Sequence, residues 1–256
     1  MTSSPAIPTV HVEGNDDRGV VARWFPGTSF QLAGGKDQVR RRVATSYLSF
    51  GLLDRDFAED DVVQASRDPG SRLFLLARYC IENYLLEPPI IAEAVRRLAG
   101  AGDISADWLD EGAIAQRIFD WGNSVALYAA ANSIVAEWRD TVEAGFLRYL
   151  GPLPPLPWED VLRQLQQRLE GLPLPEHIEA SLRDRYTQVQ ADLQEWAGLH
   201  RWINGKVLLE AFLYPQVFSP LGVSQVRMRD ELIAAGMSLV PGELVDLAQR
   251  WSSPTP

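Results

Sequence analysis

The sequence predicts an α/β fold, in which a parallel sheet flanked by helices is followed by an all-helical C-terminal region. Short apolar runs alternate with amphipathic segments over roughly the first 100 of the 256 residues, and this alternation is typical of parallel sheets. From about residue 105 onward, apolar residues recur at helical spacing instead. Hydrophobic residues make up 46% of the chain, which is typical of a globular protein.

The N-terminal part is predicted to contain four strands separated by helices and turns. Asn15 is a good N-cap for a first helix, and Pro26-Gly27 ends that helix. Gly34-Gly35 predicts a turn before a basic helix, and Asp68-Pro69-Gly70 predicts a turn within the polar stretch 57–71. We expect strands at 7–13, 29–32, 48–53 and 73–76, and helices at 15–25, 36–44 and 88–97.

The remainder of the chain is predicted to be helical. The segment 151–157 contains four prolines and cannot form a regular helix, so we interpret it as a stiff connector. We therefore expect an α/β domain over residues 1–100 and a helical region over residues 101–256. The expected helices lie at 105–143, 158–170, 176–199, 206–213, 224–235 and 241–250.

Composition excludes some classes of function. The net charge of −10 argues against a general nucleic-acid coating protein, whose surface would be basic, but not against a nuclease with an acidic metal site. The single cysteine, Cys80, excludes an intramolecular disulfide and fits a reducing cytoplasm. Because no secretory signal and no apolar stretch of about 20 residues is present, we expect a cytoplasmic protein without a membrane partner.

Acidic residues follow two of the predicted strands. Glu13 follows the first strand, and Asp54 and Asp56 follow the third. The carboxyl ends of parallel strands meet at one edge of the sheet, where α/β proteins bind ligands. On an extended backbone Asp54 and Asp56 point the same way. Because three carboxylates in one crevice repel one another, a hard divalent cation such as Mg²⁺ or Mn²⁺ is the expected partner.

These acids also have a simpler interpretation, in which they are solvated residues at strand ends. We favour that interpretation for Glu59 and Asp61, which have the same spacing. Asp16 and Asp17 lie near Glu13, but could equally serve the first turn of their helix.

Two residues farther along the chain are further candidates. Glu82 lies between the apolar residues Ile81 and Leu85, so its carboxylate needs a metal, an arginine or a helix cap. The alternative is that Glu82 stabilises a helix N-terminus. Lys206 follows a glycine at a predicted helix start, where a cation is slightly unfavourable. Its alternative role is that of an ordinary solvated lysine.

Several motifs together resemble the Toprim domain of topoisomerases, primases and overcoming-lysogenization-defect (OLD) nucleases. Glu13-Gly14 and Asp54-Arg55-Asp56 are similar to the two general acidic motifs. The segments 51–57, 79–86 and 202–209 resemble the OLD-like branch and a stand-alone Toprim-like group, through GLLDRDF, an IENYL motif and a GK-leucine motif. The resemblance implies that the metal ligands are Glu13, Asp54, Asp56 and Glu82, and that Lys206 assists at the scissile phosphate.

The resemblance implies a Mg²⁺-dependent endonuclease that cleaves DNA or structured RNA in bacterial defence against phage. It also implies a separate ATPase partner of the ABC or AAA type. Gly34-Gly35-Lys36-Asp37 lacks the pattern of a phosphate-binding loop, since Phe30 and Asp37 occupy its Gly and Ser/Thr positions. The oligomeric state is left open, with a homodimer as one alternative.

Two other functions are kept as alternatives. The first is a catalytically silent Toprim-like subunit that regulates or binds an ATPase complex. The second is a phosphatase of the haloacid-dehalogenase type, with Asp54 as nucleophile and Asp56 as acid/base. The phosphatase pattern requires Thr or Val where the chain has Ala58, and it gives Glu13 no role.

Overall fold

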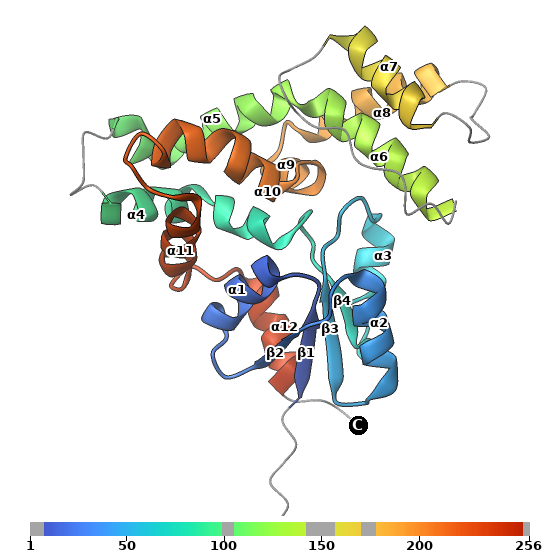
Figure 1. Ribbon diagram of the computed structural model, residues 1–256, viewed down its shortest axis with the longest axis vertical. Coiled ribbons are helices and arrows are strands. Elements are labelled where there is room, and N and C mark those ends of the chain that lie inside the picture. The colour runs from blue at the N-terminus through green and yellow to red at the C-terminus, as the bar shows by residue number, and fades with distance from the viewer. Residues whose placement is uncertain (1–7, 99–104, 142–156, 170–177, 253–256) are drawn as a thin grey trace, which may run out of the picture.

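A four-stranded, all-parallel sheet forms one end of the protein, and helices form the other (Figure 1). The computed structural model describes residues 8–98, 105–141, 157–169 and 178–252. Both the α/β fold class and the helical C-terminal region are therefore confirmed. The strands are β1 (Thr9–Val12), β2 (Ser29–Leu32), β3 (Ser49–Leu53) and β4 (Leu73–Leu75).

The strand order in the sheet is β2-β1-β3-β4. Along the chain, one helix connects each strand to the strand that follows it in sequence. Thr9 of β1 pairs with Ser29 of β2 on one side and with Ser49 of β3 on the other, and Gly51 pairs with Leu73 of β4. This parallel register brings the carboxyl ends of all four strands to the same edge. The connecting helices are α1 (Asn15–Trp24), α2 (Lys36–Thr45) and α3 (Asp60–Ala65).

The two faces of the sheet are covered by different helices. All five residues of the central strand β3 are buried, as expected for a strand in the middle of a parallel sheet. Phe50 and Leu52 join the large core that includes α1, whereas Leu53 packs with α2 in a smaller cluster. Gly51 lies on the α2 face, where Val39 approaches so closely that a Cβ atom would lie 2.6 Å away.

Beyond β4 the described residues are helical. A 3-10 helix, η1 (Ile81–Leu86), leads into α4 (Pro88–Leu98). The later elements are η3 (Ala106–Trp108), α5 (Glu111–Ser124), α6 (Ala126–Thr141), α7 (Trp158–Arg168), α8 (Ile178–Asp192), α9 (Trp196–Trp202), α10 (Gly205–Leu208), the π-helix η4 (Leu209–Phe218), α11 (Gln225–Gly236) and α12 (Gly242–Ser252).

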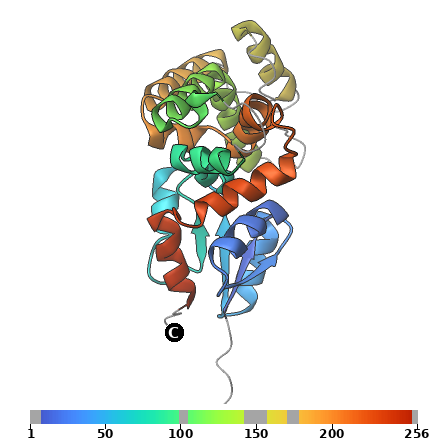
Figure 2. The same cartoon turned by 90° about the vertical axis from the view of Figure 1, so that its left-hand side faces the viewer.

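The last two helices return to the N-terminal part of the chain (Figures 1 and 2). Helix α11 packs against α4 and α1. On α12, Trp251 makes edge-to-face contacts with Phe25 and Phe30, and Glu243 accepts hydrogen bonds from the Tyr84 hydroxyl (2.6 Å) and the Ala77 amide (2.9 Å). The C-terminal helices therefore contribute to the same core as the sheet.

Two features of the predicted domain organisation fall on residues that the structure leaves undescribed. The expected boundary near residue 100 lies within residues 99–104, and most of the expected connector at 151–157 lies within residues 142–156. Both stay predictions.

The structure differs locally from the expected elements. Helix α3 lies within the stretch that was expected to be polar and to contain a turn; its Val63 is buried, while Asp60 and Asp61 stay exposed. The helix expected over 176–199 is two helices, since α8 ends at Asp192 and α9 begins at Trp196. The helix expected over 105–143 likewise divides into η3, α5 and α6.

Candidate metal centre at the carboxyl edge of the sheet

All five predicted site residues line one cavity at the carboxyl edge of the sheet. Its volume is about 380 Å³, and it is lined mainly by acidic side chains; we call it the acidic crevice. Four separate elements or their ends supply the predicted residues, namely the ends of β1 and β3, η1 and α10. The residues brought together are Glu13, Asp54, Asp56, Glu82 and Lys206, with Asp16, Asp17, Tyr79, Cys80 and Asn204 beside them.

Glu13 and Asp54 connect three of these elements by hydrogen bonds. The Asp54 amide donates to Glu13 Oε1 (2.9 Å), and the Ile81 amide donates to Asp54 Oδ1 (3.1 Å). Burial raises the pKa of Glu13 above its ordinary value, and the Lys36 ammonium and the Asp54 amide only partly offset this. Burial, followed by the charges of Asp17 and Glu13, raises the pKa of Asp54 well above its ordinary value.

Asp56 is oriented differently from the sequence-based expectation. Strand β3 ends at Leu53, and Asp56 has a left-handed backbone (φ 50°), so Asp54 and Asp56 do not alternate on one extended strand. The Asp56 amide donates to the Tyr79 carbonyl (2.9 Å), which holds this turn in place. Its carboxylate then pairs with Lys36 Nζ (2.7 Å), which also donates to the Asp54 carbonyl oxygen (2.8 Å).

The two aspartates at the start of α1 have different environments. Asp17 Oδ2 accepts a hydrogen bond from the Gly14 amide (2.6 Å), so the side chain turns back into the crevice. Burial raises the pKa of Asp17 to about 7, and the Glu82 and Glu13 charges add to the effect. Burial also acts on Asp16, but its contacts with Lys206 and Arg229 outweigh this and lower its pKa.

Glu82 of η1 and Lys206 of α10 form another side of the crevice. Glu82 is only 4% exposed, and its ion-pair neighbour is Arg229 of α11, at 4.0 Å. Lys206 Nζ donates to Asp16 Oδ2 (2.8 Å), and this contact raises the pKa of Lys206. Arg229 binds the other oxygen of Asp16 at 2.6 Å. The C-terminal region therefore supplies the cations on this side of the site.

The donor set of the acidic crevice fits a hard divalent cation. Five carboxylates influence one another here, and burial shifts several of them toward the neutral form. Such a group must either retain protons or gain positive charge, and carboxylate oxygens are the ligands that Mg²⁺ and Mn²⁺ prefer. Within the described residues, however, no three His, Cys, Asp or Glu side chains already have the spacing of a metal shell. One oxygen of each of Glu13, Asp54 and Asp56 is instead bound by an amide or by Lys36.

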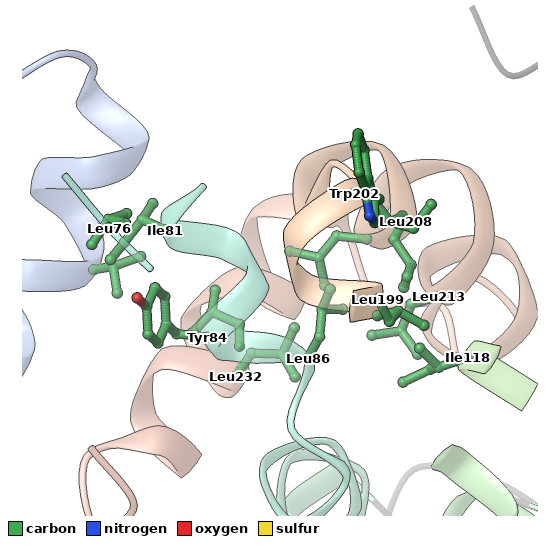
Figure 3. Close-up of a cluster of buried hydrophobic side chains, with 14 of the residues drawn as sticks. Leu76, Ile81, Tyr84, Leu86, Ile118, Leu199, Trp202, Leu208, Leu213 and Leu232 are labelled. Atoms are coloured by element: carbon green, nitrogen blue, oxygen red, sulfur yellow. The ribbon is translucent and has the colours of Figure 1, made fainter. Parts of the chain in front are cut away.

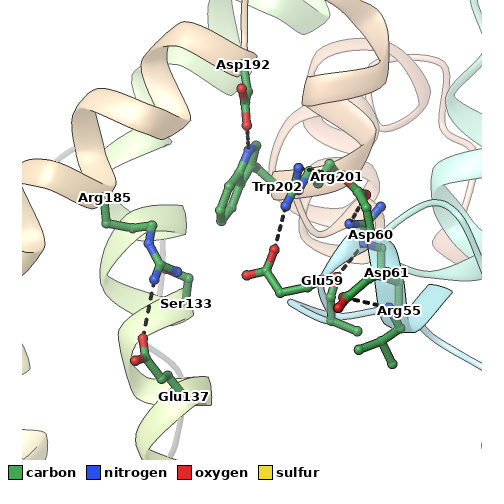
Figure 4. Close-up of polar contacts among 12 residues, drawn as sticks. Arg55, Glu59, Asp60, Asp61, Ser133, Glu137, Arg185, Asp192, Arg201 and Trp202 are labelled. Carbon is green, nitrogen blue, oxygen red and sulfur yellow. Dashed lines mark hydrogen bonds and ion pairs between the residues drawn. The ribbon is translucent and has the colours of Figure 1, made fainter. Parts of the chain in front are cut away.

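A second, wider cavity extends from Glu13, Asp54 and Asp56 toward the helical region. This outer cleft, of about 860 Å³, lies between α2 and the helices α6 and α8. Arg185 of α8 lines this cleft and contacts Ser133 and Glu137 of α6, as Figure 4 shows. Of the three consecutive arginines on α2, only Arg40 lines the cleft.

Sequence reasoning missed Lys36 as a site residue. Its pattern had been considered only as a phosphate-binding loop. A usable signal was present in the sequence, because Gly34-Gly35 comes one residue after the expected end of the second strand. In the structure both glycines have positive φ angles (96° and 124°). They carry the chain across the same edge of the sheet as Glu13, so the next residue reaches the crevice. Asn83 was missed as well, because its contacts with Ile203 and Gly205 join segments that are distant in sequence. Asn204 was also missed, although its role as N-cap of α10 is local.

Comparison with known proteins adds no family. Neither a scan against protein-family models nor a search of curated proteins finds a match to this chain. The described helices include none that is both long and apolar enough to cross a membrane. The roles of the site residues therefore rest on the motifs and on the geometry of the crevice.

Proposed function

We propose that the acidic crevice binds Mg²⁺ or Mn²⁺ and that the protein is an endonuclease that hydrolyses phosphodiester bonds in DNA or structured RNA. The observation that carries this proposal is the environment of Asp54, which is surrounded by Asp17, Glu13, Glu82 and Asp56 at the ligand-binding edge of a parallel sheet. Such a concentration of negative charge is favourable in a fold mainly when a cation joins it.

The side chains around the crevice have the chemistry that hydrolysis requires. Asp54, Asp56 and Glu82 would hold cations, which when bound neutralise charge on the attacking and leaving oxygens. Glu13, whose pKa is raised, is a stronger base than an ordinary glutamate and is suited to accept the proton of the attacking water. Lys206 stands at the opposite side and would stabilise negative charge on the phosphate.

We also propose that ATP hydrolysis, where the system requires it, belongs to a separate ABC- or AAA-type partner in an anti-phage defence complex. This proposal is based on the contacts of Lys36, which follows the Gly34-Gly35 turn. Its ammonium is bound by Asp56 and by the Asp54 carbonyl group, and does not face a loop that could hold phosphates. ATP hydrolysis by the purified chain would contradict this assignment.

One observation favours a second candidate, a catalytically silent Toprim-like regulatory subunit. Lys36 pairs with Asp56, and Lys206 pairs with Asp16. These internal ion pairs partly neutralise the crevice without a bound cation. A silent subunit would keep the pairs and bind its partner without turnover.

The test is cleavage of supercoiled DNA and total RNA in Mg²⁺ or Mn²⁺ by the wild type, Asp54→Asn and Asp61→Asn. Asp61 is the matched control, because it is an exposed acid whose side chain binds the adjacent Val62 amide. We expect Asp54→Asn to lose at least about 100-fold in rate and Asp61→Asn to match the wild type. Cleavage that survives Asp54→Asn would refute the site, and no cleavage by any form would favour the silent subunit.

A further inference from the structure

We propose that Asn83 is a positioning residue, whose side chain joins η1 to the α9–α10 turn and thereby sets Lys206 against the acidic crevice. Since this role is defined by the site, it rests on the proposed function. The two segments lie about 120 residues apart in the chain, and each contributes one wall of the crevice: Glu82 on η1, and Asn204 with Lys206 on the turn.

The Asn83 side-chain amide binds backbone groups of both segments, and it also contacts the His200 ring (3.3 Å) and the Cys80 thiol (3.1 Å). The residue is completely buried. Its Oδ1 accepts hydrogen bonds from the amides of Gly205 (2.9 Å) and Cys80 (3.2 Å), and its Nδ2 donates to the Ile203 carbonyl (2.9 Å). A side-chain amide is the group that can both accept and donate in this way. Asn83 therefore fixes the α9–α10 turn at two points, one before and one after Asn204.

Gly205 allows the two segments to meet. A Cβ atom on this residue would lie 2.5 Å from the Asn83 backbone nitrogen and 2.6 Å from its Oδ1, which is shorter than real Cβ contacts. Any larger residue must push the turn away from η1. The close approach and the hydrogen bonds therefore depend on the same pair of residues.

Hydrophobic packing surrounds this joint but does not specify its geometry. Figure 3 shows Ile81, Tyr84 and Leu86 of η1, with Leu199 and Leu208 from the segment on the other side of the joint. Hydrophobic contacts are non-directional and tolerate small shifts, whereas hydrogen bonds depend steeply on distance and angle. Packing stabilises the joint, and the Asn83 amide sets its register.

The position of Lys206 follows from the turn. The Asn204 side chain accepts hydrogen bonds from the amides of Lys206 (3.0 Å) and Val207 (3.3 Å), which caps α10. Lys206 directly follows Gly205, and its ammonium reaches Asp16 at 2.8 Å. A shift of Gly205 is therefore passed on to the lysine within one residue.

A second set of contacts links α9 to the loop that carries the predicted ligands Asp54 and Asp56. The Tyr79 amide donates to the His200 carbonyl (2.7 Å) in α9, and the Tyr79 carbonyl accepts from the Asp56 amide (2.9 Å). Arg201 of α9 also pairs with Glu59 (2.9 Å) and Asp60 (3.0 Å) at the start of α3, as Figure 4 shows. Helix α9 therefore contacts the loop that carries Asp54 and Asp56, directly through Arg201 and indirectly through Tyr79. Asn83 connects the end of α9 to η1, which carries Glu82.

The test compares Gly205→Ala with Gly51→Ala as a matched control. In both variants the new methyl group clashes at about the same distance, but Gly51 faces Val39 and Leu73 on the α2 side, away from the joint. We expect Gly205→Ala to lower kcat at least tenfold with KM nearly unchanged, while Gly51→Ala retains wild-type kcat. Adding Lys206→Ala to Gly205→Ala should cause no further loss, because the lysine is already displaced. If the losses in kcat of the two single variants multiply in the double variant, the proposal is overturned.

A second readout does not require activity. Cys80 is the only cysteine, it is buried, and its thiol lies 3.1 Å from Asn83 Oδ1, so its reaction with a thiol reagent reports opening of the joint. We expect at least tenfold faster labelling in Gly205→Ala than in Gly51→Ala, after correction for the global stability of each variant. Asn83→Ser provides a second variant with the same expected direction.

Equal labelling rates would overturn the proposal, whatever the activity. If the wild type cleaves no substrate but the labelling rates differ as expected, the joint is established and only the proposed nuclease function fails.

Discussion

Replacing Asp17 by Asn is expected to stabilise the protein at alkaline pH. The Asp17 carboxyl lies in the crevice beside other acids, and burial raises its pKa from 3.8 to about 7. Each pKa unit corresponds to about 1.4 kcal/mol, so the ionised side chain destabilises the fold by up to about 4 kcal/mol. Asparagine cannot ionise, and its oxygen can still accept the hydrogen bond from Gly14.

The sign of the effect follows from the direction of the shift. A carboxyl whose pKa is higher in the folded state loses stability as the pH rises from 3.8 toward about 7. His200 acts in the opposite direction, because burial lowers its pKa to about 4, so the fold loses stability as the pH falls below 6.5. Because His200 is present in both proteins, its contribution cancels when the stability of Asp17→Asn is compared with that of the wild type at the same pH.

The assay is denaturant unfolding at pH 5 and pH 8, without divalent cations, for the wild type, Asp17→Asn and Asp37→Asn. We expect Asp17→Asn to exceed the wild type by about 2–4 kcal/mol at pH 8 and by less than about 2 kcal/mol at pH 5. Asp37 is the control, since it is an 81% exposed acid in the first turn of the next helix and should change stability by less than about 0.5 kcal/mol.

Mg²⁺ at pH 8 should then stabilise the wild type more than Asp17→Asn, because it would compensate the charge that the variant lacks. Two results would refute this reasoning. One is an Asp17→Asn variant that is less stable than the wild type at both pH values. The other is a stability difference that does not change between pH 5 and pH 8.

Two further predictions concern Lys36 and the glycines. Lys36→Met should bind Mn²⁺ about tenfold more tightly by calorimetry, because the ammonium 2.7 Å from Asp56 no longer competes for its carboxylate; weaker binding would show that Lys36 supports the site instead. Gly51→Ala should lower the free energy of unfolding by about 1–3 kcal/mol through its clash with Val39. Gly19→Ala should raise the free energy of unfolding by about 0.5–1 kcal/mol, because Gly19 lies in α1 and no atom is near the added methyl group. Both variants are measured by urea unfolding, and equal effects would contradict the packing of β3 on α2.

Local patterns in the sequence predicted much of the N-terminal part. Strand β2 spans Ser29–Leu32 as expected. Helix α1 lies where it was expected, but its N-cap is Gly14, and Asn15 is the first helical residue instead of the predicted cap. Because strand periodicity and turn residues act over a few neighbours, they can be recognised without the fold. Glu13 and Asp54 were expected to meet for a similarly general reason, since the carboxyl ends of parallel strands share one edge.

Some local geometry of the site was not predictable from the pattern. Asp56 lies on a left-handed turn, and its orientation depends on the Tyr79 carbonyl and on Lys36. Strand β3 ends at Leu53 as predicted, but the backbone does not continue extended from Asp54 to Asp56. The conformation of such a turn depends on which distant groups are available to bind its backbone, and the sequence alone does not show these.

The sequence by itself determined the fold class, the acidic character of the site and the edge of the sheet where most of its acids lie. Tertiary structure decided how the site is completed. Asn83 meets Gly205 across about 120 residues, and Arg229 of α11 approaches Glu82. Such contacts depend on how the helices pack as whole bodies, and no local sequence pattern records which faces will meet.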